Sequence, residues 1–288
     1  MGGLRGRAQW AGSVGGHNEV VNLRAKRLIA VATAVVAAGV LGGAVAGWWR
    51  WDTARRPQVG PVVADLNAAV ADVVVAAGDG AAVAVSPVVE SARCRLGLHH
   101  GGLFSARADL YTDTGGEDAL ITGIAQRLPA RYAAGRGPAV AGVRTLRAGL
   151  GDGVSLSVSR LSPGWLAVVA RSACSLGRVA APSPPAGATA ATTALTRMLG
   201  SLGTRPATLS DQHVSCAAGG QIDTVDAVSE PVDSGGLAGR LNGIVPTGAH
   251  RFAAGDANRV VYREGAVSVI VAASDDGTAV TAQYTTVC

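Results

Sequence analysis

The residues with the clearest potential for chemistry are four cysteines: Cys94, Cys174, Cys216 and Cys288. They could ligate a metal, react as free thiols or form disulfides. A metal site is disfavoured, because there is no C-x-x-C pair and no Cys/His cluster with the usual ligand spacing. Disulfides are therefore predicted, although four cysteines alone leave three pairings open.

Other polar groups could bind a ligand, but each has a simpler interpretation. His99 and His100 are followed by two glycines and have no acidic residue or cysteine at a supporting spacing, so we predict a solvated hairpin loop. The stretch Asp113-Thr114-Gly115-Gly116 could bind an anion at a helix N-terminus. Its acidic first residue favours plain N-capping instead.

No catalytic motif stands out in the chain. Asp275 and Asp276 are adjacent on an expected turn, where neighbouring side chains point apart. The patterns G-x-S-x-G, H-E-x-x-H and the phosphate-binding P-loop are absent from the sequence. We therefore predict no catalytic, cofactor-binding or metal-ligating residues, and expect a protein that is not an enzyme.

An internal duplication is the strongest organising signal. Residues 113–135 and 233–255 align without a gap, and nine of the 23 positions are identical. The cysteines follow the same register, so each copy lies between its own pair. If an ancestral module had one bridge, the pairs are Cys94 with Cys174 and Cys216 with Cys288.

Each copy predicts a similar order of elements. A helix over residues 61–78 or 189–202 precedes two strands, and the repeated Asp-[Thr/Ser]-Gly-Gly opens a short second helix. In the first copy Thr114 and Glu117 are predicted to form a capping box. Three further strands should complete each copy. The expected fold class is α+β, with a single N-terminal transmembrane helix and two tandem modules whose helices pack on an antiparallel sheet.

The charge distribution excludes a nucleic-acid-binding domain. The formal net charge is +5, and the first 50 residues, with six basic side chains and one acidic side chain, account for all of it. Residues 51–288 are neutral overall. The basic side chains therefore form an N-terminal flank and no basic domain.

This flank precedes an apolar run that predicts a transmembrane helix. Residues 28–49 contain no charge and would form a helix about 33 Å long, enough to cross a bilayer. The positive-inside tendency places residues 1–27 in the cytoplasm and the C-terminal region outside the cell membrane. A cleaved signal peptide, cut after Ala46, is the alternative. An oxidising exterior also suits disulfides.

The remaining boundaries follow from composition. Residues 50–60 are predicted as a juxtamembrane linker, 61–176 as module 1, 177–188 as a Pro-rich linker and 189–288 as module 2. Gly39, Gly43 and Gly47 are spaced four apart, a pattern that could pair two transmembrane helices in a homodimer or could reflect a glycine-rich composition.

The region expected outside the membrane resembles a group of known sequences. The resemblance rests on the stretches ADLYT and DAL and on strands that end in cysteine. This region resembles uncharacterised single-pass membrane proteins of high-GC actinobacteria with a duplicated, disulfide-bracketed extracytoplasmic module. The resemblance implies a location and an architecture but no activity. We expect a non-catalytic cell-envelope protein that binds or scaffolds another envelope protein. The alternative is a sensor or carrier that holds a small ligand or lipid between its modules.

Overall fold

The computed structural model describes residues 48–50, 52–140, 143–150, 153–253 and 258–288. The chain divides into two compact units, residues 1–55 and 56–288. In the first unit, residues 48–50 and 52–55 are helical, and Trp48 and Trp49 are exposed. The expected cytoplasmic segment 1–27, most of the expected transmembrane helix, the glycine motif and the cleavage site after Ala46 lie outside the described residues.

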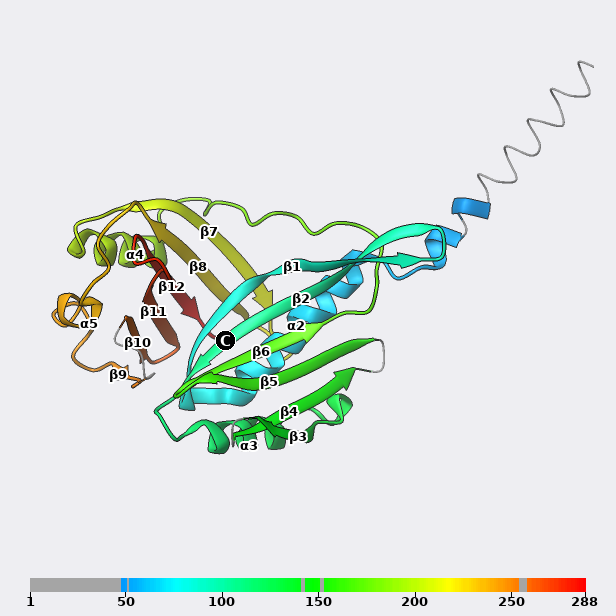
Figure 1. Ribbon diagram of the computed structural model, residues 1–288, viewed down its shortest axis with the longest axis horizontal. Helices are drawn as coiled ribbons and strands as arrows, with labels where there is room; N and C mark the ends of the chain where they lie inside the picture. The colour runs from blue at the N-terminus through cyan, green and yellow to red at the C-terminus, as the bar shows by residue number, and fades with distance from the viewer. Residues whose placement is uncertain (1–47, 51, 141–142, 151–152, 254–257) are drawn as a thin grey trace, which may run out of the picture. The chain divides into compact units, whose positions relative to one another are not determined.

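The first module forms a six-stranded antiparallel sheet with strand order β1-β2-β6-β5-β4-β3. Figure 1 shows this sheet in cyan to green, with α2 running along it. Its elements in chain order are α2 (Val59–Ala77), η1 (Gly78–Gly80), β1 (Ala82–Leu96), β2 (His99–Tyr111), α3 (Glu117–Arg127), η2 (Ala130–Tyr132), β3 (Gly135–Val140), β4 (Val143–Leu150), β5 (Val154–Ser162) and β6 (Trp165–Arg171).

The second module repeats this topology. Its six-stranded antiparallel sheet has the order β7-β8-β12-β11-β10-β9, which matches the first sheet strand for strand. Its elements are α4 (Ala190–Ser201), β7 (Pro206–Ser215), β8 (Gln221–Ser229), α5 (Leu237–Arg240), β9 (His250–Arg251), β10 (Arg259–Glu264), β11 (Val267–Ala273) and β12 (Val280–Thr286). The duplication is therefore one of sheet topology as well as of sequence.

Two details of the predicted order were wrong. Four strands, and not three, follow the second helix of each module. In the second module that helix is α5, which has only four residues and begins after Gly236 in the left-handed conformation. The sequence between residues 241 and 249 is rich in glycine and contains Pro246, which disfavours a longer helix.

The core of the first module follows from simple periodicities. Leu66, Val70 and Val73 recur along one side of α2 and are almost fully buried. Phe104 and Leu110 occupy one face of β2 by the alternation of a strand, and they belong to the same buried cluster. The second module has its own cluster, in which Leu195 and Leu199 of α4 meet residues of β11 and β12.

Helix α2 has the length and composition of a membrane span. Among the described residues it is the one helix that passes such a test, over Val59–Gly80, but 44% of its most apolar stretch is buried inside the protein. Leu66, Ala69 and Ala71 are fully buried. A helix that is apolar on most sides is expected where it forms the centre of a core.

Candidate functional site: the module junction and the Cys94–Cys174 clamp

Arg263, on β10, reaches from the second module to the end of α2 in the first. Its Nη1 donates to the carbonyl oxygens of Gly78 and Ala81 at 2.6 and 2.7 Å, and its Nη2 donates to a carboxylate oxygen of Asp79 at 2.7 Å. Its Nε donates to the carbonyl of Gly265 at 2.8 Å. Only 8% of Arg263 is exposed. A buried cation therefore meets the carbonyl end of a helix, where the helix dipole favours positive charge.

An apolar cluster joins the two modules as well. Tyr111 stacks on Trp165 with ring centroids 5.7 Å apart, and the guanidinium of Arg259 lies 4.0 Å from the Trp165 ring centroid. An arginine above an indole face is favourable, particularly where water is excluded. The buried members of the cluster are Ala82, Ala84 and Tyr111 from the first module and Phe252, Val261 and Ile270 from the second.

The repeated sequence motif contributes to this junction. Asp113 accepts a hydrogen bond from the backbone N–H of Ala253 at 3.4 Å and lies 3.2 Å from Nε2 of His250. The Oγ1 of Thr114 donates to the carbonyl of Ala253 at 2.7 Å. One copy of the repeat thus contacts the other, an arrangement that the alignment of the two copies did not indicate.

The capping box predicted for Thr114 and Glu117 was wrong. The N-cap of α3 is Gly116, without a side-chain hydrogen bond. Glu117 instead accepts from the backbone N–H groups of Gly115 at 2.8 Å and Gly164 at 2.7 Å. Burial alone would raise the pKa of Glu117, but these hydrogen bonds and the positive charge of Arg160 hold it below its ordinary value. Glu117 therefore fixes the start of α3 to the β5–β6 turn.

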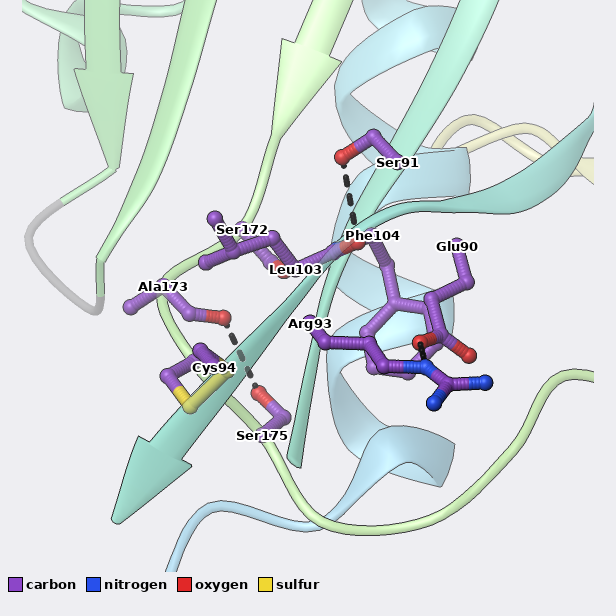
Figure 2. Close-up of a disulfide and its surroundings, with 10 residues drawn as sticks. Glu90, Ser91, Arg93, Cys94, Leu103, Phe104, Ser172, Ala173 and Ser175 are labelled. Carbon is purple, nitrogen blue, oxygen red and sulfur yellow. Dashed lines mark hydrogen bonds and ion pairs between the residues drawn. A yellow bond between two sulfur atoms is a disulfide. The ribbon is translucent and has the colours of Figure 1, made fainter. Parts of the chain in front are cut away.

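The Cys94–Cys174 disulfide fastens the far end of the β1–β2 hairpin to the segment that follows β6. Figure 2 shows Cys94 on its strand, with Ser175 and Ala173 on the adjoining segment. Gly102 and Ser175 exchange two backbone hydrogen bonds at 2.9 and 3.0 Å. Gly101 allows this approach, since a Cβ there would lie 2.6 Å from the Ser175 carbonyl oxygen and 3.1 Å from the Cys174 sulfur.

The chain that enters α2 is held at the same place. The N–H of Val59 donates to the carbonyl of Leu176, and the N–H of Leu176 donates to the carbonyl of Pro57, both at 2.8 Å. An Arg56 side-chain nitrogen lies 3.3 Å from the position that a Cβ on Gly97 would take. We define residues 56–59, 94–102 and 174–177 as the clamp.

The second disulfide, Cys216–Cys288, lies where the second module meets the first. Cys216, Val214 and Ile222 come from the end of the β7–β8 hairpin, yet they belong to the buried cluster that contains α2. Both disulfides are the pairs that the duplication predicts, and none of the described cysteines is free. Each disulfide thus holds the end of a hairpin, β1–β2 or β7–β8, that contacts α2 or the chain entering it.

The predicted hairpin loop at His99 and His100 was wrong. Both residues belong to β2, paired with Leu96 and Arg95 of β1, and His99 is buried to 8% exposure. The turn itself contains Gly97, whose φ of 63° suits glycine. In the described part of the chain, no three His, Cys, Asp or Glu side chains form a group that could hold a metal ion.

The predicted turn at Asp275 and Asp276 is present. Asp276 accepts hydrogen bonds from Oγ of Ser274 at 2.6 Å and from the N–H of Thr278 at 3.0 Å. These bonds lower the pKa of Asp276 to about 2. Its carboxylate therefore stabilises the turn before β12 and is not poised to transfer protons near neutral pH.

Asp226 on β8 is the described carboxylate with a strongly raised pKa. Burial raises the pKa of Asp226 to about 6, against the opposing effect of a 2.5 Å hydrogen bond from Nε2 of Gln283 on β12. A raised pKa can mark a catalytic acid. Here the carboxylate accepts a hydrogen bond from an amide, which does not titrate, so this contact pairs it with no second acid or base.

Open grooves lie beside α2 and at the junction. A groove of 440 Å³ runs between α2, the Pro-rich segment and β7, with Asn67, Pro182 and His213 among its lining residues. A smaller groove of 230 Å³ at the junction is lined by Asp79, Arg263 and Cys288, among others. A further groove of 430 Å³ at the junction is lined by Asp79, Phe252 and Arg263, among others. Small-molecule sites commonly enclose about 300–1,000 Å³, so this groove and the one beside α2 lie within that range, whereas the 230 Å³ groove is below it.

The chain matches no protein-family model, and neither the curated proteins nor the solved structures contain a match to it.

Proposed function

We propose that this protein is a membrane-anchored component of the cell envelope that binds or scaffolds another envelope protein without chemistry of its own. Residues 28–49 would provide the anchor, and the two modules would stand outside the membrane. Two disulfides suit that compartment, because such bonds persist where the surroundings are oxidising. The resemblance to actinobacterial membrane proteins remains a prediction.

The observation that carries the proposal is the junction at Arg263. A nearly buried arginine that donates four hydrogen bonds, three of them to the other module, is costly to separate from its partners. The two modules therefore act as one body, despite the Pro-rich segment between them. Fixed modules present their surfaces to a partner with little loss of conformational entropy on binding, which favours a scaffold.

The same observation bears on the alternative of a carrier or sensor. A ligand at the centre of the junction would need the space that Tyr111, Phe252 and Ile270 occupy. The 440 Å³ groove beside α2 has a suitable size. This groove and the 430 Å³ groove at the junction are where a small ligand or lipid would bind if the alternative holds.

Crosslinking in native membranes, followed by purification of the full chain and mass spectrometry, tests the proposal. A reproducible protein partner supports scaffolding. Recovery of only a lipid or metabolite would instead support the carrier. Alkaline carbonate extraction tests the anchor separately, since a spanning chain stays with the membrane. The intact mass distinguishes the anchored chain from one cleaved after Ala46.

A further inference from the structure

The tip of the β1–β2 hairpin lies at the end of the second unit where the chain arrives from the predicted anchor. Arg56, which opens this unit, lies against Gly97 in the hairpin turn, and Pro57 and Val59 pair with Leu176 in the clamp. Figure 1 shows the hairpin end beside the start of α2. From residue 49 to Arg56 the chain can span at most about 25 Å.

This tip has the composition of a membrane-surface contact. From Ser91 to Gly102 the sequence contains two arginines and two histidines and no acidic residue. The Arg93 side chain is 96% exposed, and its contact with Glu90 at 4.0 Å is too long and too open to neutralise it. Leu98 is 72% exposed at the turn, and Arg95 is exposed as well. An exposed leucine beside arginines suits the boundary between lipid headgroups and acyl chains.

The clamp gives this tip a fixed position. The Cys94–Cys174 disulfide and the Gly102–Ser175 hydrogen bonds tie the hairpin to the segment that pairs with Pro57 and Val59. The hairpin therefore cannot swing away from the point of chain entry without breaking these bonds. A surface held in place loses little entropy when it binds.

We propose that the hairpin tip, with Arg93, Arg95 and Leu98, binds anionic lipid headgroups on the bilayer that residues 28–49 cross. This inference rests on the anchor in the proposed function and adds a second, electrostatic contact to it. The occupant is a lipid surface, because the tip lies against Arg56, a short distance along the chain after the predicted anchor, and because its charge complements anionic lipids. Binding of an envelope protein to the same tip is the competing outcome.

The test is amide hydrogen exchange on the full chain in nanodiscs of phosphatidylcholine, with and without phosphatidylglycerol. We expect slower exchange at residues 95–98 only with the anionic lipid. Each arginine contributes about a 5-fold factor to binding at an anionic surface. The variant R93S/R95S should therefore exchange at the rate seen in the neutral bilayer. The separate variant L98E, which retains both arginines, should also lose protection in the anionic bilayer.

The matched control is R197S/R205S, which removes the same charge from exposed positions of the second module. It should leave the protection at the tip unchanged. Non-reducing peptide mapping confirms that each variant retains both disulfides. Equal protection in the two bilayers, or protection that survives R93S/R95S, overturns the inference. A chain that does not stay with the nanodiscs overturns the anchor and the inference together, so the two failures are distinguishable.

Discussion

The guanidinium of Arg263 lies 2.7 Å from the carboxylate of Asp79, although 184 residues separate the two in the chain. The two partners differ sharply in burial. The Arg263 side chain is 9% exposed, whereas that of Asp79 is 99% exposed. The ion pair is therefore screened by water, and the more deeply placed hydrogen bonds from Arg263 to the Gly78 and Ala81 carbonyls should contribute more to the junction than the ion pair does.

Substitution of Arg263 tests this division of roles. The variant R263M leaves two helix-end carbonyls without their donors, and each buried unsatisfied group costs about 1–3 kcal/mol. We expect a marked fall in the thermal unfolding midpoint of the full chain in detergent. D79N, which removes only the exposed charge, should change the midpoint far less. Equal effects of the two variants would show that the ion pair dominates.

Both disulfides can be tested by non-reducing peptide mapping. We expect peptides that join Cys94 to Cys174 and Cys216 to Cys288. A peptide that joins Cys94 to Cys216 would contradict the arrangement. Replacing either pair by serine should lower the free energy of unfolding by about 4 kcal/mol in the chain-entropy model. For C216S/C288S, contacts with α2 should weaken too, and faster amide exchange in α2 is the readout.

Several of these features could be predicted from the sequence. The duplication predicted the disulfide pairs, and local patterns predicted a helix over residues 61–78, where α2 lies, followed by two strands, which are β1 and β2. The helix and the strands were predicted from local periodicity, which the backbone converts directly into a buried face, whereas the disulfide pairs followed from the common register of the two copies.

The junction could not be predicted in this way. Arg263 alternates with Tyr262 on β10 and looks like an ordinary solvent-facing residue, because no local pattern shows that another module covers its face. The capping box predicted for Glu117 was wrong for a related reason. Its spacing from Thr114 fits a capping box, but the turn at Gly164, distant in sequence, offered its carboxylate a backbone N–H. The failures thus lie where tertiary contacts override local chemistry.

Gly101 is the position where the clamp should be most sensitive. In G101A the new Cβ would meet the backbone oxygen of Ser175 at 2.6 Å, and a backbone atom held by a disulfide moves with difficulty. Overpacking of this kind costs about 1–3 kcal/mol. G135A, at a glycine of β3 with no atom within 4 Å of the added methyl, is the matched control. Comparable unfolding midpoints for the two variants would argue against a tight clamp.

Asp226 predicts how stability depends on pH. Its folded-state pKa of about 6 lies above the ordinary value of 3.8, so the folded protein binds the proton more tightly than the unfolded chain. The resulting stabilisation is complete below pH 3.8 and is lost as the pH rises through about 6. The loss amounts to about 2–3 kcal/mol by linkage.

The variant D226N tests this pH dependence, because it keeps an oxygen that can accept a hydrogen bond from Gln283 but carries no charge. Urea unfolding at a series of pH values should therefore find D226N more stable than the wild type at pH 7, with the difference shrinking as the pH falls toward 4. A constant difference across that range would mean that ionisation of Asp226 is not its cause.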